Sequence, residues 1–197
     1  MELMATDGVQ NITQDEFPPQ SQYLTSDFIL NRTKALKKKL DAANRSKHME
    51  LKRTGGGIII SFSTGMFELY RSALLSLYNV TPRVDVDATR SAKFREVVSI
   101  TPDDNHTYTV QLLLTSSKWQ VQGDEAYFLD HELSKLQEKV DSVLLQNNTD
   151  IDSVNNQMKE VLNQVTQIMD ISNKDTMDTE EPPCGQESGQ QNILVLS

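Results

Sequence analysis

The most regular alternation of apolar and polar residues lies in the middle of the chain. Tyr108, Val110, Leu112 and Leu114 alternate with mostly polar residues. This period of two is typical of a strand with one buried face. The polar triplet at 116–118 is typical of a turn, so we expect the chain to reverse direction there.

A second, shorter alternation and a helix follow. Trp119 and Val121 alternate with glutamines, Gly123 ends the run, and Asp124 is placed to cap a helix. Beyond it, apolar residues recur at alternating steps of four and three, as a helix with one apolar face requires: Leu129, Leu133, Leu136, Val140 and Val143. The pattern predicts a helix that lies on a small antiparallel sheet.

The segment upstream adds further elements. Ile58–Phe62 is short and apolar, as in a buried strand, and Ser63 or Thr64 can cap a helix that runs to about Tyr78. Residues 79–88 contain Pro82 and read as a loop, and residues 94–100 form a plausible strand. We therefore predict an α+β core domain over residues 58–146.

Residues 149–171 carry a second amphipathic pattern. Apolar residues occupy the a and d positions of a short coiled coil: Ile151, Val154, Met158, Val161, Val165 and Ile168. The first interpretation is a helix that self-associates into a homo-oligomer. The alternative is that this helix packs back on its own domain.

Charge separates residues 27–57 from the rest. Between positions 31 and 57, nine Lys or Arg stand against Asp41 and Glu50, a local charge of +7 in a chain of net charge −9. A thin apolar stripe predicts a basic helix that ends at the three glycines 55–57. Such a helix can bind the phosphates of DNA or RNA, serve as a basic signal read by a protein, or be simply solvated or docked on the acidic remainder of the chain.

The end of this basic segment, Lys52 to Gly57, resembles the third-helix end of Myb/SANT-like DNA-binding domains of transposon-derived animal proteins. The resemblance covers residues 33–57 and lacks the tryptophans of the first two helices. It implies contacts to nucleic-acid phosphates and no base reading, with these candidate residues: Lys37, Lys38, Lys39, Lys47, Lys52 and Arg53.

Residues 106–146 are similar to an uncharacterised strand-strand-helix segment of mobile-element-associated proteins. The similarity rests on Tyr108-Thr109-Val110, on Val121-Gln122-Gly123 and on a helix bearing Phe128 and the pair Leu133 and Leu136. It implies a fold and no activity. A separate hypothesis has Trp119, Tyr108 and Tyr127 form a surface on an open sheet that could stack on bases.

Composition limits the remaining choices. The mean hydropathy is −0.48 and the apolar fraction is 37%. Residues 1–26 and 172–197 therefore read as a disordered leader and an acidic disordered tail. A single cysteine, Cys184, and an N-terminus without a signal-peptide pattern favour an intracellular protein. No apolar run is long enough to span a membrane, so we expect no membrane contact, and the basic segment favours the nucleus over the cytoplasm.

The sequence offers little for catalysis. His48, His106 and His131 lie in different elements without a cysteine set, and no nucleophile motif is present, so we expect no metal, no cofactor and no enzyme. The resulting hypothesis is a non-enzymatic, nucleic-acid-associated adaptor, derived from a mobile element. The alternative is a protein–protein interaction module without nucleic-acid binding.

Overall fold

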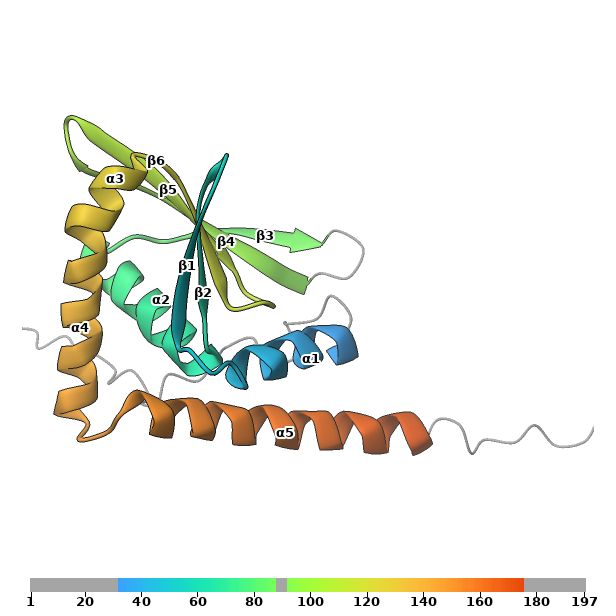
Figure 1. Cartoon of the computed structure of the whole chain (residues 1–197). Coiled ribbons are helices and arrows are strands. Elements are labelled where there is room, and N and C mark those ends of the chain that lie inside the picture. Colours follow the sequence, from blue (N-terminus) through green and yellow to red (C-terminus); the bar gives the residue numbers. More distant parts are fainter. Residues whose placement is uncertain (1–31, 88–91, 176–197) are drawn as a thin grey trace, which may run out of the picture.

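A six-stranded antiparallel sheet covered by helices on one side forms the α+β fold of this protein (Figure 1). The computed structural model describes residues 32–87 and 92–175. The sheet order is β1-β2-β6-β5-β4-β3, built from these strands: β1 (Met49–Thr54), β2 (Gly57–Phe62), β3 (Arg83–Asp87), β4 (Ala92–Asp103), β5 (His106–Leu113) and β6 (Lys118–Gly123). The predicted leader (1–26) and most of the predicted acidic tail lie outside the described residues.

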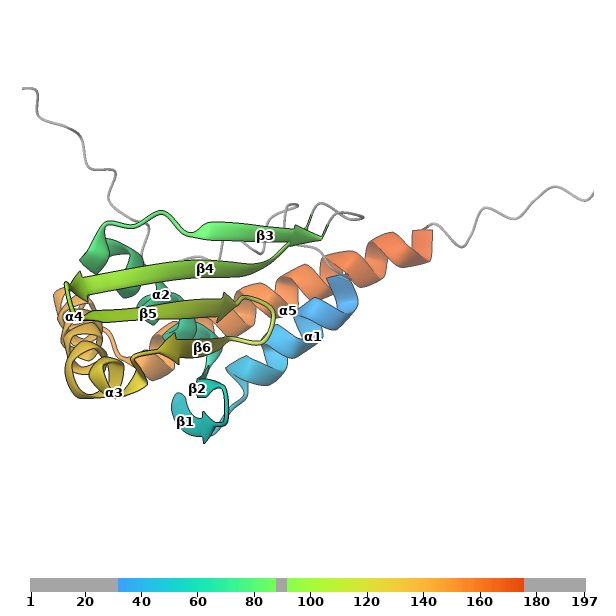
Figure 2. The same ribbon diagram turned by 90° about the horizontal axis from the view of Figure 1, so that it is seen from above.

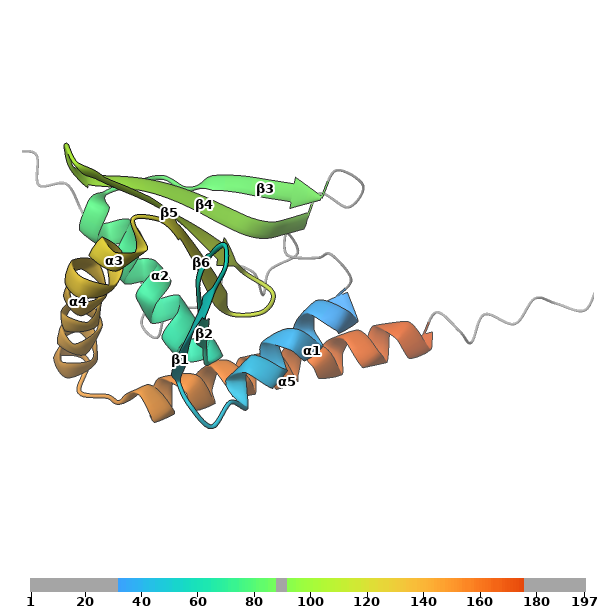
Figure 3. The ribbon, with the colours of Figure 1, turned by 45° about the horizontal axis from the view of Figure 1, so that its top comes forward.

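Helices supply the other layer. They are α1 (Arg32–Ala43), α2 (Thr64–Tyr78), α3 (Glu125–Tyr127), the π-helical turn η2 (Phe128–Glu132), α4 (Leu133–Gln146) and α5 (Ile151–Asp175). Figure 3 shows α2 and α4 beneath the sheet, with α1 and α5 along one end. The Asp124 carboxylate accepts a hydrogen bond from the backbone N–H of Tyr127 at 3.1 Å, so the predicted cap is confirmed.

The basic segment does not form one helix, which corrects the prediction for residues 27–57. α1 ends at Ala43, and residues 49–54 form the edge strand β1. The glycines make the turn of the β1–β2 hairpin instead of a helix end. Gly57 has a φ of +134°, and a Cβ there would collide with the carbonyl oxygen of Val121 on β6. A side chain at position 57 would therefore break both the turn and the strand contact.

A second correction concerns residues 79–88, predicted as a loop. Arg83–Asp87 form the other edge strand, β3, which pairs with β4 through a β-bulge. The alternation Val84-Asp85-Val86-Asp87 is a strand pattern, but Pro82 and the two aspartates also match a loop. The β4–β5 pairing decides between them, because it creates an edge with which residues 83–87 can form hydrogen bonds.

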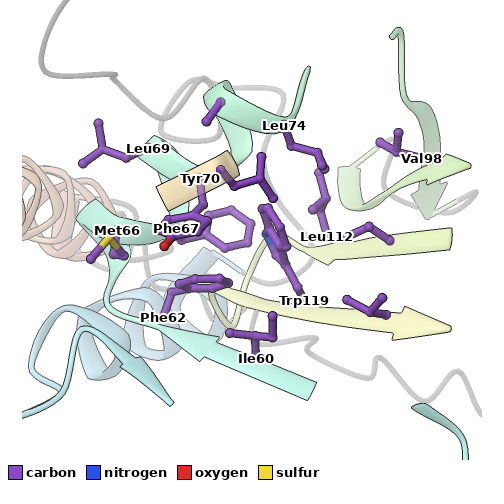
Figure 4. Close-up of a cluster of buried hydrophobic side chains, with 14 of the residues drawn as sticks. Ile60, Phe62, Met66, Phe67, Leu69, Tyr70, Leu74, Val98, Leu112 and Trp119 are labelled. Atoms are coloured by element: carbon purple, nitrogen blue, oxygen red, sulfur yellow. The ribbon is translucent and has the colours of Figure 1, made fainter. Parts of the chain in front are cut away.

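The core lies between the sheet and α2 (Figure 4). Phe62 packs against Tyr70 and Trp119, with ring centroids 5.1 Å and 5.2 Å apart. The alternating residues predicted to face the helices are buried: Tyr108, Val110, Leu112, Leu114, Trp119 and Val121. The helix face also matches the prediction in part, since Leu136 and Val140 are buried and Leu129, Leu133 and Val143 pack at the margin.

One asparagine joins three helices. Asn155 on α5 accepts a hydrogen bond from the backbone N–H of Gly65 at 3.0 Å and donates one to the carbonyl of Ala43 at 2.8 Å. It therefore satisfies a free N–H at the start of α2 and a free carbonyl at the end of α1. The Ser63 side chain, at the N-cap of α2, makes no capping bond. α5 thus fixes α1 against α2.

No described helix combines the length and the apolar character that crossing a membrane requires.

We expect Gly65→Ala to destabilise the protein. A Cβ at this position would lie 2.8 Å from Asn155 Cα and 2.9 Å from its backbone nitrogen, so α5 would have to move. Overpacking of this kind costs about 1–3 kcal/mol. The measurement is urea unfolding followed by circular dichroism. Gly55→Ala is the matched control, because a Cβ at Gly55 meets nothing within 4 Å. Equal stability of the two variants would contradict the close crossing.

Candidate nucleic-acid interface

α1 presents one basic face to solvent. Lys34, Lys37 and Lys38 are exposed, whereas Ala35, Leu36, Ala42 and Ala43 are buried. Residues three and four apart share a face of a helix, so the three exposed lysines lie together. Figure 2 shows α1 alongside α5, and contacts between Leu36, Ala43 and Leu162 hold the two helices together. The lysine face is therefore carried on a helix that is packed along its other faces.

Lys39 does not belong to that face, and its prediction as a phosphate contact is wrong. Its side chain is fully buried, with Nζ 3.1 Å from Glu68 Oε1 and 4.6 Å from the centroid of the Phe67 ring. Burial lowers the pKa of this lysine, while the neighbouring Glu68 carboxylate opposes the shift. Successive residues of an α-helix are rotated by about 100° about its axis, so Lys39 points into the core although its neighbour Lys38 is exposed.

A second buried ion pair lies beside the first. Arg71 on α2 makes two hydrogen bonds of 2.8 Å to the carboxylate of Glu96 on β4. Lys39, Glu68, Arg71 and Glu96 therefore connect α1, α2 and the sheet through charged groups removed from water. Electrostatics fixes the position of α1, and with it the orientation of the exposed lysines.

The remaining predicted phosphate contacts are spread out. Lys47 is exposed in the connection between α1 and β1. Lys52 and Arg53 are exposed near the tip of the β1–β2 hairpin and, as consecutive residues of a strand, point to opposite faces of the sheet. The structure thus brings Lys37 and Lys38 together, adds Lys34, and leaves Lys47, Lys52 and Arg53 elsewhere.

The predicted self-association stripe is used within the chain. Val154, Met158 and Leu162 of α5 are buried, and Ile151, Val161 and Val165 are partly buried. Val154 and Met158 are therefore closed to a second copy, and the alternative interpretation, packing on the domain, is correct for them. Ile168 lies on α5, but its side chain is outside the described set.

The stacking hypothesis is wrong for Trp119 and Tyr108, and Tyr127 lies on α3 against the His106 ring and not on the sheet. Trp119 and Tyr108 are 0% and 1% exposed, because both face the helices. Neither ring can reach a nucleic-acid base.

A serine, a histidine and an aspartate form a line at the junction of β1, α2 and α5. His48 Nδ1 lies 2.9 Å from Ser63 Oγ, and His48 Nε2 lies 3.0 Å from Asp152 Oδ1. The arrangement resembles that of hydrolytic triads, but Ser63 is fully buried. A nucleophile must reach its substrate, so this line acts as a structural tie between three elements.

A second histidine cluster lies at the start of β5, around His106. His106 Nδ1 is 2.8 Å from Asp103 Oδ1, its Nε2 is 3.6 Å from Asp124 Oδ2, and its ring stacks on Tyr127 at 4.0 Å. Hydrogen bonds from the Asn105 backbone and from His106 lower the pKa of Asp103. Within the described ranges, no three His, Cys, Asp or Glu residues are arranged to hold a metal ion.

Comparisons of this chain with protein-family models, with curated proteins and with solved structures find no match.

We expect Lys39→Met to destabilise the protein strongly and Lys38→Met to leave its stability unchanged. Removing one partner of a buried pair leaves a desolvated charge, here Glu68, which costs about 3 kcal/mol or more. Urea unfolding at neutral pH measures the difference. The double variant Lys39→Met/Glu68→Leu should recover much of the loss. Similar midpoints for Lys38→Met and Lys39→Met would contradict the burial of Lys39.

Proposed function

We propose that this chain is a non-enzymatic, nucleic-acid-associated adaptor that contacts phosphates through the exposed lysine face of α1. The observation that carries the proposal is the position of Lys34, Lys37 and Lys38 on one helix face, with Asp41 as the one exposed acid described on α1. Lysine ammonium groups contact phosphates as point charges, and release of condensed counterions supplies the free energy of binding.

The setting of α1 defines what kind of contact is feasible. α2 and α5 cover the other faces of the helix, so α1 cannot enter a groove along its whole length. Its lysines can touch the backbone of a nucleic acid from outside. Contacts of this type position a protein on nucleic acid without reading its sequence. The mobile-element origin and the nuclear location remain expectations drawn from the sequence.

The alternative is a protein–protein interaction module without nucleic-acid binding. The observation that favours it is the sheet face opposite the helices, on which Ile59, Val97 and Leu113 are only partly buried. Aliphatic side chains on an open sheet face serve protein contacts and do not stack on bases.

Binding of a short DNA or RNA duplex, followed by fluorescence anisotropy at increasing salt, tests the proposal. Neutralising Lys37 and Lys38 together, as Lys37→Gln/Lys38→Gln, should flatten the plot of log affinity against log salt. The slope should change by about 0.9 for each phosphate that the variant no longer touches. The matched control is Lys139→Gln, which removes an exposed lysine from α4.

Two results would contradict the proposal. One is no binding of duplex or single-stranded nucleic acid at low salt. The other is binding whose salt slope does not change in Lys37→Gln/Lys38→Gln, because the phosphates would then be held elsewhere.

A further inference from the structure

The sheet face opposite the helices is an ordered polar surface. A chain of hydrogen bonds crosses it: Arg95 donates to Asp85 at 2.7 Å and to Gln111 at 2.9 Å, Gln111 donates to Gln122 at 2.8 Å, and Gln122 donates to the carbonyl of Gly56 at 3.2 Å. These bonds reach from β3 to the β1–β2 turn. Side chains that are already held by hydrogen bonds lose little conformational entropy when a partner binds, which favours binding.

The strand register arranges the face in rows that run across all six strands. One row ends in acids at both edges: Glu50, Ser61, Lys118, Leu113, Arg95 and Asp85. The next row ends in bases at both edges: Lys52, Ile59, Gln120, Gln111, Val97 and Arg83. An acid on each edge strand therefore lies one row away from a base on the same strand.

This pattern is complementary to itself. Consider a two-fold axis just above the open face, parallel to the sheet and at right angles to the strands, midway between the two rows. Rotation about this axis places the acid-ended row of a second copy over the base-ended row of the first, and the reverse. It also maps a twisted sheet onto a surface of the same shape, so two such faces can stack about 10 Å apart. Glu50 then faces Lys52 of the second copy, and Asp85 faces Arg83 of the second copy.

We propose that the open sheet face binds a second copy of this chain, forming a symmetric dimer of stacked sheets. The sheet has six strands, so at ~4.8 Å between strands and ~3.3 Å per residue the face covers roughly 500 Å². Two copies would bury about 1,000 Å², near the lower limit of specific interfaces, so the dimer is weak and concentration-dependent. Partly buried Ile59, Val97 and Leu113 give it an apolar centre.

The two ends of the face do not contribute equally. Asp85 is already paired within its own chain, 2.5 Å from Arg95 and 3.4 Å from Arg83. Glu50 and Lys52 on β1 are both exposed, so their pairing across the axis changes more on association. The sharpest test therefore lies on β1. None of the residues in the two rows belongs to α1, so the dimer does not depend on the nucleic-acid proposal.

Sedimentation equilibrium of the full chain, from micromolar to millimolar concentration, measures the dimer. Glu50→Lys and Lys52→Glu should each raise the dissociation constant, because like charges then face each other across the axis; about tenfold is expected for one repulsive contact made twice. The double variant Glu50→Lys/Lys52→Glu rebuilds the pair with its charges exchanged and should restore association. Glu138→Lys is the control: it makes the same charge change on the exposed side of α4 and should have no effect.

Three outcomes would overturn the proposal. The first is a wild-type chain that stays monomeric over the whole range. The second is a dimer that persists unchanged in Glu50→Lys and in Leu113→Asp, since another surface would then hold it. The third is a double variant that associates no better than the single ones. Circular dichroism of each variant verifies that a weaker dimer does not reflect an unfolded chain.

Discussion

Four charged side chains removed from water hold the layers of this protein together. Lys39 pairs with Glu68, and Arg71 pairs with Glu96, so α1 is joined to α2 and α2 to β4. Burying such groups costs free energy that is returned only when every partner is in place. Alternative packings of α1 would leave a charge without its counterpart. The two ion pairs therefore select one arrangement of the helices more than they add to stability.

The position of the surface lysines follows from this constraint. Because Lys39 is anchored in the core, Lys34, Lys37 and Lys38 must face outward, and because α5 lies along α1, no other face of the helix is open. The helix layer carries this basic face, and the uncovered side of the sheet carries a polar, self-complementary one.

The spacing of apolar residues predicted the central strands and the helix after Asp124, but it did not predict which lysines of α1 are exposed. The alternation around Tyr108 and Trp119 and the four-three spacing after Asp124 depend on burial of one face, which a sequence expresses directly. Lys39 lies three residues from Leu36 and four from Ala43, on the buried face of α1, but the sequence does not show its partner Glu68, 29 residues away. The β1 strand was not predicted for a related reason: three of its residues, Glu50, Lys52 and Arg53, are charged because an edge strand is open to solvent.

The α5 stripe illustrates the same limit. Its apolar spacing predicts a helical partner but does not say whether that partner belongs to the same chain. Asn155 could have pointed to the answer, because a polar residue within the buried stripe needs specific partners, and Gly65 offers a backbone close enough to supply one.

The Asn155 junction also affects how the chain can be assembled. The bond from Asn155 to Ala43 joins residues 112 positions apart, so α1 is made long before the group that satisfies its last turn exists. During synthesis, the Ala43 carbonyl at the end of α1 therefore has no Asn155 to bond until the whole sheet and α4 have been made. Contacts between such distant segments slow folding. α5 therefore holds α1 in place, and a chain interrupted before Asn155 would leave α1 without a stable position.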